Sequence, residues 1–73
     1  MNTHALSKNE TLVVSGPASI SLIEGKATVL GAPLRPGAKT VVRRGRSLPV
    51  YAEEDSQVSV VLGEGGEVLK VEG

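Results

Sequence analysis

The 73-residue sequence contains no cysteine, no tryptophan and no phenylalanine, and Tyr51 is its single aromatic residue. Without cysteine the chain forms no disulfide and no cysteine-based zinc site. Without further aromatic rings, the core has to be built from valine, leucine, isoleucine and alanine, which each bury less area. A domain of this length also buries only about 60% of the surface that its unfolded chain exposes. The composition therefore predicts a thin core, marginally stable alone or supported by a partner surface.

Long apolar runs are absent as well. No run approaches the ~18 residues that a membrane-spanning helix needs, and the first ten residues lack the apolar stretch of a signal peptide. We therefore expect a soluble, cytoplasmic protein. Residues 1–10 are polar and aperiodic, which is typical of a flexible N-terminal arm. His4 lies in this arm without companion ligands at metal-site spacing, so we assign it no role.

From Thr11 onward, short runs rich in valine, isoleucine and leucine alternate with glycine and proline. A period near two, interrupted by such turn residues, is the pattern of an all-β protein. It predicts a small antiparallel β-sandwich or flattened barrel of about seven short strands, in a single domain over residues 11–73. The expected strands cover residues 11–16, 18–24, 26–31, 39–44, 47–53, 56–63 and 67–72.

Alternation along these strands also predicts which side chains face the core. The predicted inner set is Ile20, Leu22, Ala27, Val29, Val41, Leu48, Val50, Val58, Val60 and Leu62. The predicted outer set is Ser19, Ser21, Thr28, Thr40, Gln57 and Ser59. Because proline has no N–H to donate, Pro49 indicates that its strand lies at a sheet edge or contains a bulge.

The charges are divided along the chain although the net charge is zero. Residues 47–73 hold six acids against Lys70, whereas residues 35–46 hold five basic residues and no acid, namely Arg35, Lys39, Arg43, Arg44 and Arg46. Three interpretations are open: solvated charges at a hairpin turn, which we favour; arginines that dock on another domain; or direct contact with nucleic acid. Binding of single strands usually adds aromatic platforms for the bases, and Tyr51 alone does not supply them.

Catalytic and metal-binding motifs are missing from the sequence. The acidic run Glu53 to Asp55 is interpreted as a polar turn, because hard-cation loops spread their oxygen ligands over a longer spacing. A phosphate-binding P-loop requires Gly, four residues and then Gly-Lys-Ser/Thr, and no stretch fits. We therefore expect that the chain by itself is not an enzyme and has no catalytic residue, no metal and no cofactor of its own.

The run GPASISLIEGKATVLGAPLRPGAKTVVRRGRSLPVYAEED, followed by VSVVLGEGGEVLKVEG, resembles the N-terminal β-domain of archaeal polynucleotide 5′-hydroxyl kinases. This family includes the kinase subunit of the mRNA 3′-end cleavage factor and rRNA-processing kinases. Three stretches carry the resemblance: Gly16-Pro17 ahead of a strand, the glycine-bounded stretch from Gly25 to Gly37, and the GRSLPV-containing stretch from Val42 to Val50. The resemblance covers residues ~12 to 73 and rests on turn-and-strand patterns.

The resemblance implies a non-catalytic accessory domain that packs on a P-loop kinase domain absent from this chain. The parent enzyme would use ATP and Mg²⁺ to phosphorylate the 5′-hydroxyl of RNA or DNA, and the β-domain would help form the nucleotide or RNA site. No nucleotide-contacting residue is transferred from the family to this chain. Two alternatives remain: a stand-alone β-barrel that binds nucleic acid through its basic turn, and a homo-oligomeric module that uses the strand near Pro49.

Overall fold

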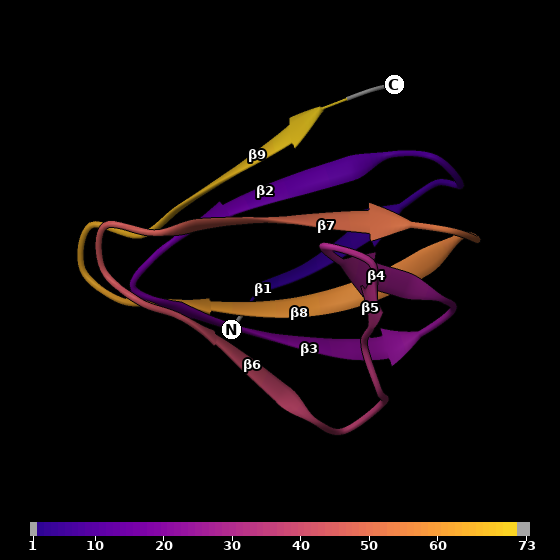
Figure 1. The fold of residues 1–73 in the computed structure, drawn as a ribbon, viewed down its shortest axis with the longest axis horizontal. Helices are drawn as coiled ribbons and strands as arrows, with labels where there is room; N and C mark the ends of the chain where they lie inside the picture. Colours follow the sequence, from indigo (N-terminus) through magenta and orange to yellow (C-terminus); the bar gives the residue numbers. More distant parts are fainter. Residues whose placement is uncertain (1, 72–73) are drawn as a thin grey trace.

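The computed structural model describes residues 2–71, which form two antiparallel sheets packed face to face (Figure 1). The four-stranded sheet has the order β1-β8-β3-β6, and the five-stranded sheet has the order β5-β4-β7-β2-β9. The strands are β1 (Asn2–Leu6), β2 (Thr11–Ser15), β3 (Ala18–Glu24), β4 (Ala27–Val29), β5 (Ala32–Pro33), β6 (Lys39–Val42), β7 (Ser47–Ala52), β8 (Ser56–Leu62) and β9 (Glu67–Val71). The predicted all-β sandwich is confirmed, with nine strands among the described residues instead of about seven.

All seven predicted strands are present, most of them one or two residues shorter than predicted. The segment predicted as one strand over 26–31 instead ends at Val29, turns at Leu30-Gly31 and continues as β5, a short strand that the sequence does not indicate. Glu72, the last residue of the predicted strand 67–72, lies outside the described residues.

The expectation of an arm without secondary structure over residues 1–10 is wrong for residues 2–6, which form β1. This strand pairs antiparallel with β8, and Leu6 is only 2% exposed at its end. The segment lacks hydrophobic alternation, and its pairing with β8 uses backbone hydrogen bonds, which any residue other than proline supplies. A turn then leads into β2. In this turn the Glu10 N–H donates to Ser7 O at 2.9 Å.

The core lies between the sheets and consists entirely of aliphatic side chains. Seven of the predicted inner residues are buried, and alternation is therefore confirmed for Ile20, Leu22, Ala27, Val29, Val50, Val58 and Val60. Leu48 and Leu62, also predicted inside, are half-buried and pack against this core.

The prediction for Val41 is wrong, because Val41 is 69% exposed while Val42 is 1% exposed. Two adjacent valines leave alternation ambiguous, and pairing with β3 decides between them, since Val42 lies opposite the buried Ala18. Ser59 shows a second difference: it was predicted on the outer face, yet it is only 8% exposed, in the middle of β8, where Thr3 of β1 and Ser21 of β3 pair with it.

Pro49 lies in β7, which runs inside the five-stranded sheet between β4 and β2. The expectation of an edge strand is therefore wrong for β7 as a whole. However, β4 pairs only with residues 50–52 of β7, whereas Pro49 pairs with Val13 of β2 alone. The proline thus occupies the part of β7 that has a strand on one side only.

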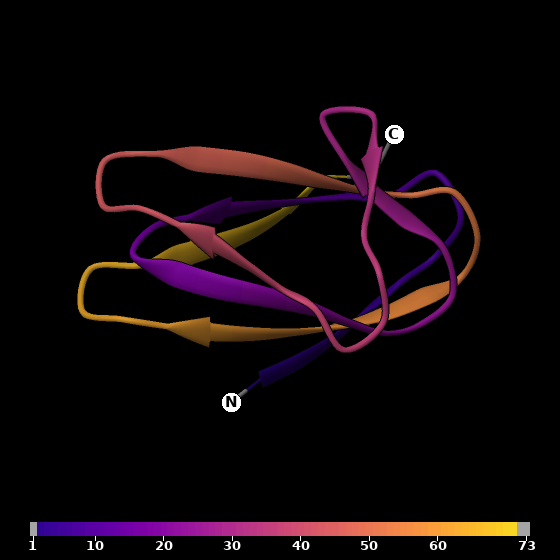
Figure 2. The ribbon, with the colours of Figure 1, turned by 60° about the horizontal axis from the view of Figure 1, so that its bottom comes forward.

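The connections between strands gather at the two ends of the sandwich. In Figure 1 the β2–β3, β6–β7 and β8–β9 connections lie at the left, and the β1–β2, β3–β4 and β7–β8 connections lie at the right. Figure 2 shows the β4–β5 hairpin projecting from the rest of the sandwich. This arrangement places residues 43–46 at one end and residues 53–55 at the other.

Candidate docking or nucleic-acid interface

Three of the five predicted basic residues lie on the single turn that connects β6 to β7, which we call the arginine turn (residues 43–46). The Arg46 N–H donates to Arg43 O at 3.0 Å and closes the turn. Gly45 has a φ of 82°, in the left-handed region that glycine adopts at little cost. Arg43, Arg44 and Arg46 are all exposed.

The arginine turn is fixed to the sandwich through Gly16. The Gly16 N–H donates to Arg46 O at 2.9 Å, and Gly16 also forms a parallel bridge with Arg44. A Cβ atom at Gly16 would collide with the backbone of Val42 and Arg43. Glycine at this position is therefore what allows the β2–β3 connection and the arginine turn to approach each other.

The guanidinium groups of the arginine turn have no carboxylate within 4.0 Å among residues 2–71. The ion pairs in this part of the chain lie elsewhere: Lys26 Nζ is 3.5 Å from Glu54 Oε2, and Lys70 Nζ is 4.0 Å from Glu10 Oε1. The three arginines are therefore exposed without an ion-pair partner among residues 2–71.

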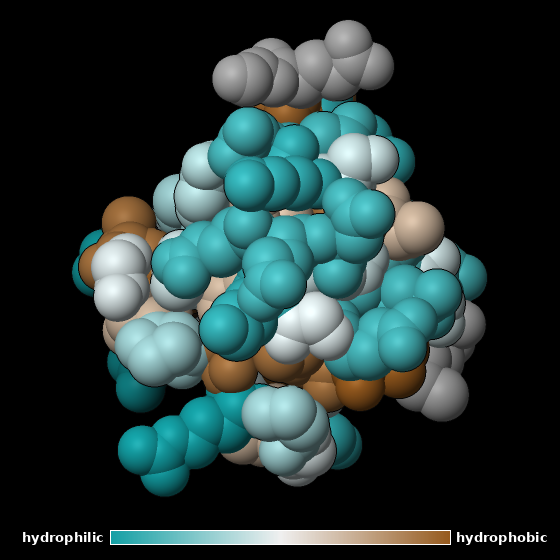
Figure 3. Space-filling view, turned by 90° about the vertical axis from the view of Figure 1, so that its right-hand side faces the viewer, coloured by the Kyte–Doolittle hydropathy of each residue, from teal (hydrophilic) through white to brown (hydrophobic). Residues whose placement is uncertain are grey.

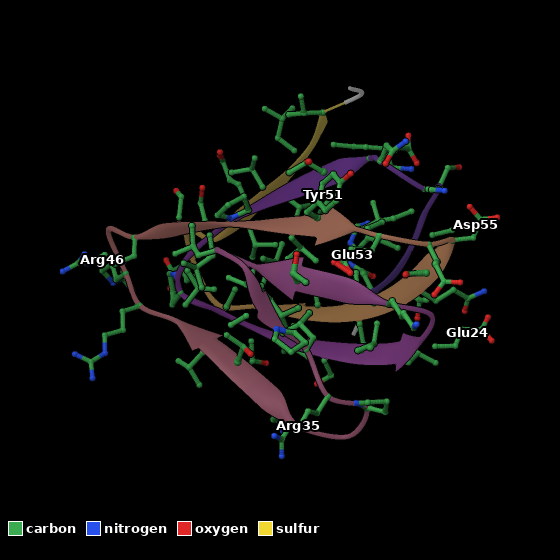
Figure 4. The ribbon with its side chains drawn as sticks, turned by 45° about the vertical axis from the view of Figure 1, so that its right-hand side comes forward. Glu24, Arg35, Arg46, Tyr51, Glu53 and Asp55 are labelled. Atoms are coloured by element: carbon green, nitrogen blue, oxygen red, sulfur yellow. The ribbon has the colours of Figure 1, made fainter. Side chains whose placement is uncertain are left out.

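Arg35 and Lys39 do not join the arginine turn. Arg35 opens a separate turn in which the Ala38 N–H donates to Arg35 O at 3.1 Å. Lys39 begins β6, and four strand residues span about 13 Å, so it lies roughly that far from the arginine turn. Figure 4 shows Arg46 at one end of the sandwich and Arg35 at its lower border. The five basic residues that are close in sequence are thus one cluster of three and two separate charges.

A groove lies beside the arginine turn, between β6 and the first half of β7. It has a volume of about 430 Å³ and is lined by Leu30, Val41, Val42, Arg43, Arg46, Ser47 and Leu48. We call it the β6 groove. Four of its seven lining residues are aliphatic, and its charged side chains are two of the three arginines of the turn. Sequence reasoning missed Leu30 as a member of this site, because its only signal is a large apolar residue next to Gly31 in a predicted strand.

Glu24 and residues 53–55 lie toward the opposite end (Figure 4), where the surface is largely hydrophilic (Figure 3). Two other acidic residues, Glu64 in the β8–β9 connection and Glu67 at the start of β9, lie at the same end as the arginine turn (Figure 1). Residues 53–55 connect β7 to β8, as predicted. The Glu53 N–H donates to Lys26 O at 2.9 Å, and the Asp55 carboxylate accepts the Lys8 N–H at 2.9 Å. Within residues 2–71, no three histidine, aspartate or glutamate side chains are placed to hold a metal ion.

The comparisons with known proteins identify no family for this chain. No protein-family model matches it, and no curated protein matches it. Within the described residues there is also no helix of the length and hydrophobicity needed to cross a membrane.

Proposed function

We propose that the chain is a non-catalytic N-terminal accessory domain of an ATP-dependent polynucleotide 5′-hydroxyl kinase of the archaeal type. Support comes from the sequence motifs that carry the family resemblance and from the positions of these motifs in the fold. Gly16-Pro17 connects β2 to β3, the stretch from Gly25 to Gly37 contains the β4–β5 hairpin, and the stretch from Val42 to Val50 contains the arginine turn. The resembling stretches thus contribute connected parts of one small sandwich.

The arginine turn is the observation that carries a role for this domain. Three exposed guanidiniums without carboxylate partners in residues 2–71 favour contact with an anionic surface or with phosphates. In the proposed parent, a P-loop kinase domain would bind ATP and Mg²⁺ and would transfer the phosphoryl group. The β-domain would pack on that kinase domain and assist formation of the nucleotide or RNA site. Such an enzyme would act in the cytoplasm on RNA or DNA.

The test begins with the reading frame downstream of the codon for Gly73. The proposal expects that frame to encode Gly-x-x-x-x-Gly-Lys-Ser/Thr, and it expects the full protein to phosphorylate an RNA with a 5′-hydroxyl end. Removal of residues 1–73 should lower this activity, and the isolated 73-residue chain should have none. A stop codon directly after Gly73, or kinase activity in the pure isolated chain, would contradict the proposal.

A second candidate function is direct binding of nucleic acid by a stand-alone domain, which the same unpaired arginines favour. If three phosphates are contacted on a single strand, log Kd should change with log salt concentration with a slope of magnitude about 2. Replacing Arg43, Arg44 and Arg46 by glutamine should abolish RNA binding, whereas Arg35→Gln, which lies outside the turn, should leave it nearly unchanged. Fluorescence anisotropy with a labelled oligoribonucleotide measures both, and salt-insensitive binding would exclude this function.

A further inference from the structure

We propose that the β6 groove binds an extended peptide segment that carries apolar side chains and carboxylates, and that the segment adds as a strand to the free edge of β6. This inference concerns a protein partner and does not depend on a kinase parent. Recognition by strand addition uses main-chain hydrogen bonds for affinity and side-chain pockets for specificity.

Two unpaired backbone edges border the groove. β6 is the last strand of the four-stranded sheet and pairs only with β3, so alternate residues of Lys39–Val42 turn their N–H and C=O groups away from the sheet. On the facing side, Ser47 and Leu48 of β7 pair with β2 but not with β4, which ends at Val29. The sandwich is therefore open at this point in both sheets.

The apolar walls of the groove are exposed to an extent that the fold itself does not require. Val41 is 69% exposed and Leu30 is 77% exposed, while Val42 and Leu48 provide a partly covered floor. A volume of about 430 Å³ lies within the range of ~300–1,000 Å³ found for ligand sites. An apolar side chain of a bound strand would cover these residues.

Leu30 supplies an independent observation. Its φ is 51°, in the left-handed region that disfavours side chains other than those of asparagine and aspartate. A leucine here is backbone-strained and is also the most exposed large hydrophobic side chain among the described residues. Neither property favours folding, whereas contact of the leucine side chain with a partner accounts for both.

The arginines identify the charge of the partner. Arg43 and Arg46 line the groove and have no carboxylate within 4.0 Å in the described part of the chain. Guanidinium groups bind carboxylates through paired, charge-assisted hydrogen bonds. A peptide is favoured over a nucleic acid because the groove has aliphatic walls and a free strand edge and contains no aromatic side chain on which a base could stack.

The test is selection from a displayed library of random octapeptides on the immobilised 73-residue chain. We expect enrichment of sequences that alternate apolar residues with aspartate or glutamate. Binding of a selected peptide should weaken at least about tenfold in the double variant R43E/R46E and remain within about twofold in R35E, which reverses one positive charge outside the groove. Nuclear magnetic resonance should show the largest amide shifts at residues 39–42, Ser47 and Leu48.

Leu30→Asn is the second variant, because it removes an apolar wall and should relieve the backbone strain, so that an effect on binding without loss of folding can be measured. We expect it to weaken peptide binding at least about fivefold while the circular dichroism spectrum is unchanged. The proposal is overturned if no sequence class is enriched, if selected peptides bind R43E/R46E as tightly as the native chain, or if the amide shifts lie elsewhere. It is also overturned if a 5′-phosphorylated oligoribonucleotide, rather than any peptide, occupies the groove.

Discussion

Leu30 and Gly31 form the two-residue loop of the β4–β5 hairpin, and both have positive φ angles, 51° and 83°. A type I′ turn requires positive φ at both positions, and Asn-Gly is the sequence that best provides it. The chain has the required glycine in second place but a leucine in first place. This single position therefore conflicts with the local rules that the rest of the hairpin obeys.

Leu30→Asn should raise the free energy of unfolding by about 0.5–1 kcal/mol, because asparagine tolerates the left-handed backbone that strains leucine. Urea denaturation followed by circular dichroism measures the change. Leu30→Ala is the matched control. It removes the same exposed side chain, but alanine is also disfavoured at positive φ, so the free energy of unfolding should not rise by a comparable amount. A loss of stability in Leu30→Asn would show that the leucine stabilises the isolated fold.

β1 is the element for which the sequence pattern was misleading. Residues 2–6 lack alternating hydrophobic residues, yet they complete the four-stranded sheet and bring Leu6 into the core. The side chain of Lys70 in β9 donates to Ala5 O at 2.9 Å and joins this strand to the opposite sheet. A strand of this kind is fixed by contacts with partners more than fifty residues away along the chain.

Leu6→Ala should lower the free energy of unfolding by about 2–4 kcal/mol, as for other fully buried leucines, and in so small a domain this is a large fraction of the total. Thr3→Ala, on an exposed position of the same strand, should change the stability by less than about 0.5 kcal/mol. Urea unfolding of both variants distinguishes a structured strand from a mobile arm, since in a mobile arm the two substitutions would have equally small effects.

At the scale of the whole molecule, the net charge is zero but the charges are unevenly distributed. The arginine turn lies at one end of the long axis in Figure 1, together with Glu64 and Glu67, and the acidic β7–β8 connection lies at the other end of a molecule that extends 29 Å along that axis. At 0.1 M salt the Debye length is about 10 Å, so attraction between the two ends is largely screened. Repulsion among the three guanidiniums of the arginine turn acts over shorter distances, and no carboxylate among residues 2–71 lies within 4.0 Å of them to cancel it.

Stability should consequently rise, by about 0.5 kcal/mol, when NaCl is increased from about 20 mM to about 300 mM. Thermal unfolding followed by circular dichroism measures this as a small increase in Tm. In the variant with Arg43, Arg44 and Arg46 replaced by glutamine, repulsion within the turn is gone and the dependence on salt should be weaker. A Tm that falls as salt is added would mean that attractive pairs, such as Lys26–Glu54, outweigh the repulsion.

Local chemistry was sufficient to predict much of this protein from its sequence. Period-two alternation predicted the seven main strands and most of the core, because neighbouring residues of a strand point to opposite faces whatever the strand pairs with. The turn at Gly45 was predictable for a similar reason, since positive φ at a tight turn is a property of one residue and its immediate neighbours.

Contacts between distant residues determined the remainder. The sequence did not reveal that β1 joins β8, that Val42 rather than Val41 faces the core, or that Arg35 lies apart from the arginine turn. The β6 groove likewise exists only because β4 ends early beside β7 and β6 has no outer neighbour. Strand order and register depend on pairing free energies between segments far apart in the chain, and these are properties of the assembled sandwich, not of any short stretch of sequence.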